Sequence, residues 1–304
     1  LLILKIPFIK SQFFLVDKIF KTLISFSDKG GDFLFSSFIP NVGYHEAMVN
    51  FAFRALPVVI FFSSLISVSY HFGIVQIVVK WVAKIMEKSM KTSGAETLSI
   101  SANIFVGQTE APILIRPYIN NMTKSELMAV MTGGFATVAG SVLALYVLWL
   151  EKIPGIAGHM LAASIMSAPA ALVISKLIYP ETENTKTIDD LNLNIKKDSE
   201  NAMDALGKGA TDGLKLAANI GAMLIAFISI LSMVNYTLDY IFQINLQEIL
   251  GYVFAPLAWM MGIPWEEANM VGRLMGEKIV LTELIAYGTL GDLINNNMLS
   301  LIHI

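Results

Sequence analysis

Three adjacent polar residues interrupt an apolar stretch of this 304-residue chain. Gln108, Thr109 and Glu110 stand in the run NIFVGQTEAPILIRP, between Gly107 and Pro112. Glycine permits a sharp reversal of the chain, and proline is tolerated in the first turn of a new helix. We therefore expect a helix, a turn and a second helix, with the amide, the hydroxyl and the carboxylate at the tip. A loop carboxylate paired with a basic residue is the alternative, which the apolar flanks disfavour.

A second pair of polar residues has a similar setting. Thr282 and Glu283 lie in the run GEKIVLTELIAY, between two apolar halves, as Thr109 and Glu110 do in the first run. Interrupted apolar segments at corresponding places are typical of the inverted repeats of secondary transporters, in which broken helices hold substrate and ion. The two runs therefore predict two binding tips.

The two carboxylates, Glu110 and Glu283, also admit a catalytic interpretation. Glycosidases use such a pair, so a membrane-embedded hydrolase is a competing hypothesis. No nucleophile or set of metal ligands accompanies the pair, however, and the broken segments have a rationale in transport. We therefore predict that the chain is not an enzyme.

Three glycines mark a further interruption, in MTGGFATVAGSVLALYV. Gly133, Gly134 and Gly140 lie within an uncharged apolar stretch. Small residues there favour close helix packing in membranes. Alternatively the helix unwinds over residues 137–141, and its carbonyls face a hard cation such as sodium, which prefers oxygen ligands. Both interpretations remain open from the sequence.

The composition indicates where these segments lie. The chain is 55% hydrophobic and 15% charged, with a mean hydropathy of +0.63, whereas soluble domains carry about 25% charged residues. We infer an all-α integral membrane protein whose main partner is the lipid bilayer. The absence of cysteine excludes disulfides and thiolate metal sites. A net charge of -3 gives no basic surface for nucleic acid.

A membrane-spanning helix needs about 20 apolar residues. Four uncharged stretches meet that length, at 55–79, 127–150, 153–175 and 216–238. Two more are apolar but broken by glycine, proline or glutamate, at 98–115 and 249–290.

Two other segments differ from these. Residues 11–28 have helical apolar periodicity with charges between, which fits either an interfacial helix or a packed amphipathic helix. Residues 181–212 are polar and predict a solvated loop that leads into a helix. The distribution of lysine and arginine places the connections 80–97 and 176–215 in the cytoplasm.

These segments predict five regions along the chain. They are N-terminal interfacial helices at 1–54, a scaffold span and connection at 55–95, the first re-entrant hairpin with the broken helix at 96–150, scaffold spans with the cytoplasmic loop 181–212 at 151–245, and the second re-entrant hairpin with a truncated C-terminus at 246–304.

NIFVGQTEAP with the following RPY, MTGGFATVAGSV and GxKxxxxELIAY together resemble the concentrative nucleoside transporters, over most of residues 40–290. The resemblance implies a multi-span helical transporter with two re-entrant helical hairpins, broken helices and an inverted repeat. It implies a homotrimer in the plasma (inner) membrane that imports nucleosides with sodium by alternating access. Proton coupling and a truncated, inactive member of the family are the alternatives.

The resemblance also implies residue roles. The first tip and the broken helix would contact the base, and the second tip would contact the ribose; these substrate-binding residues are Gln108, Thr109, Glu110, Val142 and Glu283. Sodium would lie between the first hairpin and the broken helix, held by the side chains of Asn103 and Thr137 and the carbonyls of Val106 and Val138.

The chain departs from the family at two places. The family usually has Asn-Glu-Phe at the second tip, where this chain has Thr282, Glu283 and Leu284. Two early helices before residue 1, and a late broken helix that holds ribose through an Asn and a Ser, have no counterpart in the sequence. We therefore expect a truncated or incomplete version of the family's chain.

Overall fold

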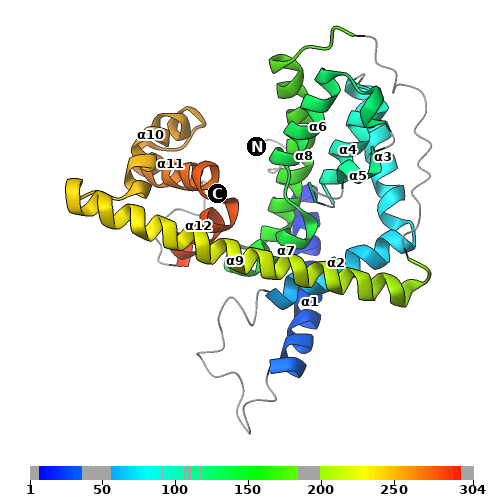
Figure 1. Ribbon diagram of the computed structural model, residues 1–304, viewed down its shortest axis with the longest axis horizontal. Helices are drawn as coiled ribbons and strands as arrows, with labels where there is room; N and C mark the ends of the chain where they lie inside the picture. The colour runs from blue at the N-terminus through cyan, green and yellow to red at the C-terminus, as the bar shows by residue number, and fades with distance from the viewer. Residues whose placement is uncertain are drawn as a thin grey trace. The chain divides into compact units, whose positions relative to one another are not determined.

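The computed structural model describes residues 7–35, 56–90, 92–105, 107–108, 111–116, 118–183 and 199–295. All regular structure within these ranges is helical, which confirms the all-α prediction (Figure 1). The chain divides into two compact units, residues 1–145 with 157–216 and residues 146–156 with 217–304.

The first unit contains seven of the described helices in full and parts of three more. The complete helices are α1 (Pro7–Phe35), α2 (Leu56–His71), α3 (Ile74–Met90), α4 (Gly94–Asn103), α5 (Ala111–Leu114), the 3-10 helix η5 (Ile119–Asn121) and α6 (Lys124–Ala136). The unit boundaries fall within α7 (Gly140–Trp149), after the first residue of α8 (Ile156–Ile178) and within α9 (Ala202–Phe242).

The amphipathic segment expected at 11–28 lies within α1. Its predicted apolar face packs: Ile24 is buried, and the ring of Phe20 stacks on Phe62 of α2 at 5.8 Å. Asp17, also buried, accepts a hydrogen bond from the backbone N–H of Ala157 at 3.5 Å, in the first turn of α8. This face therefore follows the packed interpretation, while Leu15 on another face is exposed.

The span expected over residues 55–79 is divided. The pair α2 and α3 bends by 78°. Gly73 lies at the break with φ of +78°, a left-handed conformation that glycine adopts without steric penalty and that commonly ends helices. A continuous apolar run of the sequence therefore contains a sharp bend between two helices, located at a single glycine.

Close contact between α2 and α9 depends on small residues. A Cβ atom on Gly209 would lie 2.7 Å from Cα of Ser64, and one on Gly213 would lie 2.8 Å from Cα of Ile60. Ser67 donates a hydrogen bond to the carbonyl of Ala205 at 2.7 Å. Serines of α2 therefore contribute to the contact between the two helices.

Two helices are single candidate membrane spans by length and composition. α8 corresponds to the span expected at 153–175, and α9 contains the span expected at 216–238. α9 begins earlier than its apolar stretch, at Ala202, inside the polar segment 181–212. Including the bent pairs, the described residues provide up to four candidate spans.

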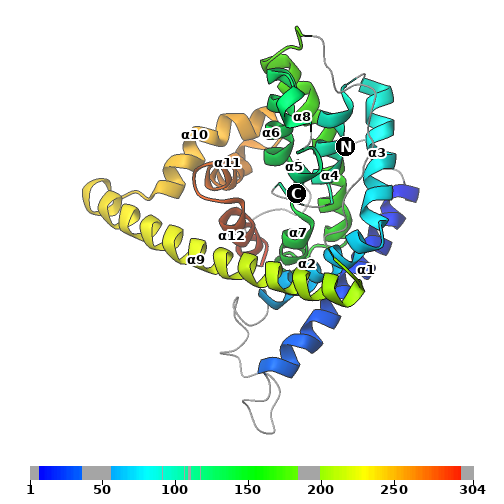
Figure 2. The ribbon, with the colours of Figure 1, turned by 45° about the vertical axis from the view of Figure 1, so that its right-hand side comes forward.

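The second unit contains α10 (Leu246–Met260), α11 (Trp265–Val280) and α12 (Glu283–Asn295). α10 and α11 bend by 117° about a turn in which Gly262 has φ of +98°, and they pack side by side (Figure 2). The rings of Trp259 and Trp265 meet edge to face across that turn at 6.4 Å. Both tryptophans are largely exposed while their rings contact each other at the turn.

Candidate functional site

The first hairpin begins with α4, whose ten residues GAETLSISAN are all buried. The helix is built from small and hydroxyl-bearing residues, so neighbouring helices can approach it closely. At its start, the N–H of Ser93 donates to Glu96 Oε1 at 2.9 Å. α4 ends at Asn103, the residue at which the predicted tip region begins.

One backbone hydrogen bond spans the tip of this hairpin. The N–H of Ala111 donates to the carbonyl of Gly107 at 3.0 Å, which closes a loop around the three residues between them. α5 starts at Ala111, so Pro112 falls in its first turn. The predicted helix, turn and helix are therefore present. Gln108 is exposed at the tip, whereas the candidate residues Thr109, Glu110 and Val106 lie outside the described residues.

The glycine-rich helix is broken, as one of the two interpretations predicted. α6 ends at Ala136 and α7 begins at Gly140. Thr137 has an extended backbone with ψ of 155°, and its hydroxyl donates to the carbonyl of Gly133 at 3.0 Å. Val138, the other candidate in the break, is half-buried. The unwound segment covers residues 137–139 of the 137–141 expected.

The same glycines also serve the close-packing interpretation. A Cβ on Gly140 would overlap the carbonyl oxygen of Phe105, and one on Gly134 would lie 3.5 Å from Cβ of Gln108. The break in α6–α7 therefore packs directly against the chain that leads from α4 into the tip. The contacts are those of Gly140 with Phe105 and of Gly134 with Gln108.

Asn103 has a feature that a structural role does not explain. Its side chain is 1% exposed, and neither Oδ1 nor Nδ2 has a hydrogen-bond partner among the described residues. Buried amides are nearly always paired, since an unpaired polar atom loses its hydration without compensation. An oxygen left without a donor suits a cation that accepts oxygen ligands.

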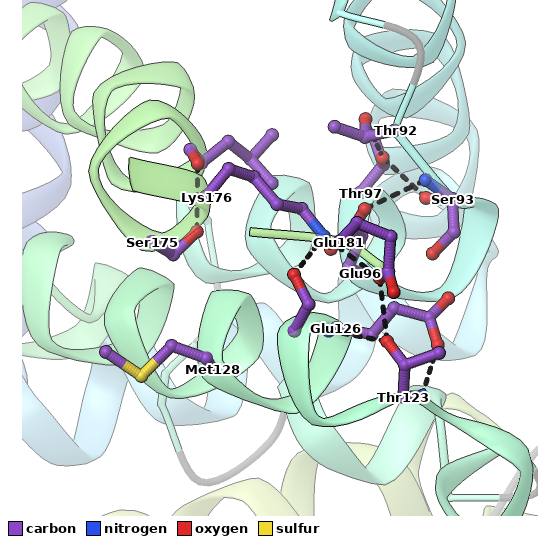
Figure 3. A network of polar contacts seen from close by, with 12 residues as sticks. Thr92, Ser93, Glu96, Thr97, Thr123, Glu126, Met128, Ser175, Lys176 and Glu181 are labelled. Carbon is purple, nitrogen blue, oxygen red and sulfur yellow. Dashed lines mark hydrogen bonds and ion pairs between the residues drawn. The ribbon is translucent and has the colours of Figure 1, made fainter. Parts of the chain in front are cut away.

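A polar network at the two ends of the hairpin converges on Lys176, near the end of α8 (Figure 3). Its ammonium group lies 2.8 Å from Glu96 Oε2 and 3.5 Å from Glu181 Oε2, and it donates to Ser125 Oγ at 3.0 Å. Glu181 also accepts from Thr123 Oγ1 at 2.7 Å. Burial raises the pKa of Glu96, and the hydrogen bond and charge of Lys176 oppose that rise.

This network joins the chain before the hairpin to the chain after it. Glu96 is in the first turn of α4, and Thr123 caps the start of α6 by accepting from the N–H of Glu126 at 3.1 Å. Glu96 pairs with Lys176 directly, and Thr123 is linked to Lys176 through Glu181. Polar contacts between the two ends are consistent with a segment that enters and leaves the membrane on one side.

The second tip lies in the second unit, between α11 and α12. Thr282 Oγ1 accepts from the N–H of Ile285 at 3.3 Å, so Thr282 is the N-cap of α12. Threonine and asparagine are both effective N-caps, so this departure from the family preserves the cap. Glu283 is the first residue of α12, half-buried, and its Oε1 accepts from the hydroxyl of Tyr146 at 2.9 Å.

Two of these residues have no local signal in the sequence. Tyr146 reads as one more apolar residue in LALYVLW, and its partner lies 137 positions away. Lys176 reads as a cytoplasmic charge at the end of a span. Only the tertiary contacts identify them, because neither residue belongs to a local pattern.

The predicted site residues are distributed over both units. Asn103, Gln108, Thr137, Val138 and Val142 lie in the first unit. Val142, in the first turn of α7, is half-buried. Glu283 lies in the second unit. That the two tips form one binding site therefore stays a prediction.

Two family models match the chain. One, described as "Nucleoside recognition", matches residues 52–152, which hold the first hairpin and the broken helix. The other, described as "Na+ dependent nucleoside transporter C-terminus", matches residues 159–303, which hold the second tip.

Curated relatives match nearly all of the chain. "Uncharacterized transporter YutK" of Bacillus subtilis (strain 168) is 43% identical over 277 residues, which cover 89% of this chain and 67% of that protein. "Sodium/nucleoside cotransporter 1" of Mus musculus is 41% identical over 282 residues, covering 90% of this chain and 41% of that protein. The chain thus spans two thirds of the bacterial relative and less than half of the mouse one.

Solved structures share the fold. The structure of CNTnw in an inward-facing substrate-bound state has a TM-score of 0.86 and 41% identity, and the match covers 95% of this chain and 70% of that one. A CNTnw variant in an outward-facing state has a TM-score of 0.87 and 39% identity, with 96% and 70% covered.

Proposed function

The chain belongs to the family of sodium-dependent, concentrative nucleoside transporters, multi-pass membrane proteins that are not enzymes, and on this premise we propose that it imports nucleosides by sodium symport. The relatives named as sodium/nucleoside cotransporters support both the cargo and the ion. The hydrolase hypothesis is set aside, because family members are transporters.

The buried, unpartnered amide of Asn103 is the observation that carries the choice of ion. We propose that its Oδ1, the hydroxyl oxygen of Thr137 and the carbonyls of Val106 and Val138 hold sodium. The hydroxyl of Thr137 already donates its proton to a carbonyl, so its lone pairs remain free to face a cation. None of these four groups carries a charge that titrates, which favours sodium over a proton.

For the cargo we propose a division between the tips. Gln108, Thr109 and Glu110 would contact the base, together with Val142, and Glu283 would accept hydrogen bonds from ribose hydroxyls. A nucleoside is neutral, so recognition needs hydrogen-bonding groups rather than a charge clamp, and carboxylates are strong acceptors. A site that pairs buried hydroxyls discriminates strongly against analogues that lack them.

Alternating access completes the proposal. CNTnw has been solved in inward-facing and outward-facing states, and this fold matches both. We propose that the unit bearing the tips moves against a scaffold in a homotrimer in the plasma membrane. Sodium drives the cycle only if it binds one state more tightly than the other.

Uptake of radiolabelled uridine into proteoliposomes tests this function. The complete gene product that carries this chain is reconstituted, and an inward sodium gradient or an inward proton gradient is imposed separately. We expect uptake with sodium and not with choline at constant pH. Uptake driven by protons alone would replace sodium symport with proton symport. The absence of uptake under either gradient would contradict the proposed function.

A further inference from the structure

The hydroxyl of Tyr146 is directed at one oxygen of Glu283. It donates to Oε1 at 2.9 Å, and both residues lie in the same unit. Among the described residues, no second hydrogen bond reaches this carboxylate from a side chain. Oε2 is therefore left to whatever approaches the half-buried tip.

The ring of Tyr146 is fixed, so its hydroxyl has a defined position. The side chain is 0% exposed. It stacks on Tyr287 of α12 with ring centroids 4.2 Å apart and an interplanar angle of 26°, and it packs against Trp149 at 6.2 Å. Aromatic pairs of this kind add stability beyond the area they bury. A rigid donor holds a carboxylate in one rotamer at little cost in entropy.

Glu283 itself has few other restraints. It is the first residue of α12, where the cap of Thr282 serves the N–H of Ile285. A glutamate has three rotatable side-chain bonds, and fixing them on binding would reduce affinity. A hydrogen bond that fixes them in advance removes this penalty.

We propose that Tyr146 is a positioning residue that presents Oε2 of Glu283 to the ribose hydroxyls of the cargo and so sets the preference for ribonucleosides over deoxynucleosides. The inference rests on the proposed function. Tyr146 is fully buried, so it acts through Glu283.

The test is a binding comparison on the purified complete gene product in saturating sodium. Tyr146→Phe keeps the stacked ring and removes only the hydroxyl. Isothermal titration is performed with uridine, 2′-deoxyuridine and 3′-deoxyuridine. We expect affinity for uridine to fall about tenfold, the value of a hydrogen bond to a charged group. Affinity for the analogue that lacks the hydroxyl bound by Glu283 should fall less than about twofold.

Tyr287→Phe is the matched control, since it removes the hydroxyl of the other ring in the same stack, and no hydrogen bond joins that hydroxyl to Glu283 in the described structure. We expect it to change every affinity by less than about twofold. In a Glu283→Gln background, Tyr146→Phe should have little further effect on uridine, because both changes remove one interaction. Equal losses for uridine and both analogues, or additive losses in the two backgrounds, would overturn the proposal.

A measurement without cargo distinguishes failure of the proposed function from failure of the proposed role of Tyr146. Thermal unfolding of Tyr146→Phe, Glu283→Gln and the double variant forms a cycle in ligand-free protein. Coupling in this cycle reports the hydrogen bond itself. If the unmodified protein bound no uridine, the proposed function would fail and the recognition role with it. If it bound uridine but the cycle showed no coupling, only the role of Tyr146 would fail.

Discussion

Asn103 combines burial with an amide that has no hydrogen-bond partner among the described residues. A buried polar group without a partner destabilises a protein, whereas a bound ion that satisfies it would stabilise the folded state by mass action. The side chain therefore has opposite effects on stability in the absence and in the presence of its ligand.

We expect Asn103→Leu to reverse these effects. Without sodium the variant should be more stable than the parent by about 1–3 kcal/mol, the penalty of a buried unsatisfied group. With sodium the parent should gain stability and the variant should not. Thermal unfolding in sodium and in choline chloride measures both. Asn120→Leu, at an exposed asparagine of η5, is the matched control. A sodium-dependent gain that survives in Asn103→Leu would contradict the assigned ion site.

Lys176 gives a second prediction at the scale of residues. Glu96 is 1% exposed and the side chain of Lys176 is 24% exposed. Lys176→Met leaves a buried carboxylate without its cation, so we expect a loss of roughly 3 kcal/mol, the lower end for broken buried pairs. Without the lysine, the already raised pKa of Glu96 should rise further.

The sign of the pH dependence follows from that rise. A carboxyl whose pKa is higher in the folded state favours folding below its unfolded pKa, and this contribution is lost as pH increases through the folded pKa. The deficit of Lys176→Met should therefore be larger at pH 8 than at pH 5, in thermal unfolding at both values. Adding Glu96→Gln should remove most of this difference. A deficit that is constant with pH would show that Glu96 does not titrate in this range.

Glycines determine the geometry of the helices, and they do so in two distinct ways. Gly73 and Gly262 make corners through left-handed φ values. Gly140, Gly209 and Gly213 instead allow backbones to approach where a Cβ would collide. Both roles produce the same sequence pattern, a glycine in an apolar run.

The crossing of α2 and α9 offers a matched pair of glycines. Gly209→Ala should reduce stability by about 1–3 kcal/mol, because its Cβ would meet backbone atoms of Ser64 that cannot move freely. Gly207→Ala, on the same helix with nothing within 4 Å, should be neutral or should stabilise by about 0.5–1 kcal/mol. Thermal unfolding in detergent compares the two. Equal effects would mean that the crossing is not tightly packed.

The elements that the sequence predicted well are those with local signals. The span at 153–175 and the tip around Gly107 and Pro112 were placed by apolar length and by turn chemistry. The bend between α2 and α3 at Gly73 was not predicted, because hydropathy contains no information about the backbone angle φ. The start of α9 at Ala202 lies among polar residues. A search for long apolar stretches does not detect it, although polar residues are compatible with a helix. The Tyr146–Glu283 contact joins distant positions and has no local signature.

At the scale of the whole molecule, the topology across the membrane is the feature to test. These 304 residues contain no cysteine, so a single cysteine introduced among them has no competing thiol in this part of the protein. Glu96 and Thr123, on either side of the first hairpin, both belong to the Lys176 network. The two ends of the hairpin should therefore face the same compartment.

We expect cysteines that replace exposed Lys88 and Asn120 to react with a membrane-impermeant maleimide only after the cells are permeabilised, so that the reagent reaches the cytoplasmic side. A cysteine that replaces exposed Lys152, before α8, should react from outside in intact cells. Labelling of Lys88→Cys and Asn120→Cys from opposite sides would show that the segment between them crosses the bilayer, and the re-entrant hairpin would have to be abandoned.

The turn at the first tip has one consequence for how cargo preference can change. Three residues of the sequence separate Gly107 from Ala111, and the N–H of Ala111 donates to the carbonyl of Gly107. Because this hydrogen bond joins positions four apart, we expect an inserted or deleted residue to break it and to rotate α5 relative to α4. New cargo preferences at this tip are therefore expected to arise from side-chain substitutions at constant loop length, and not from insertions or deletions.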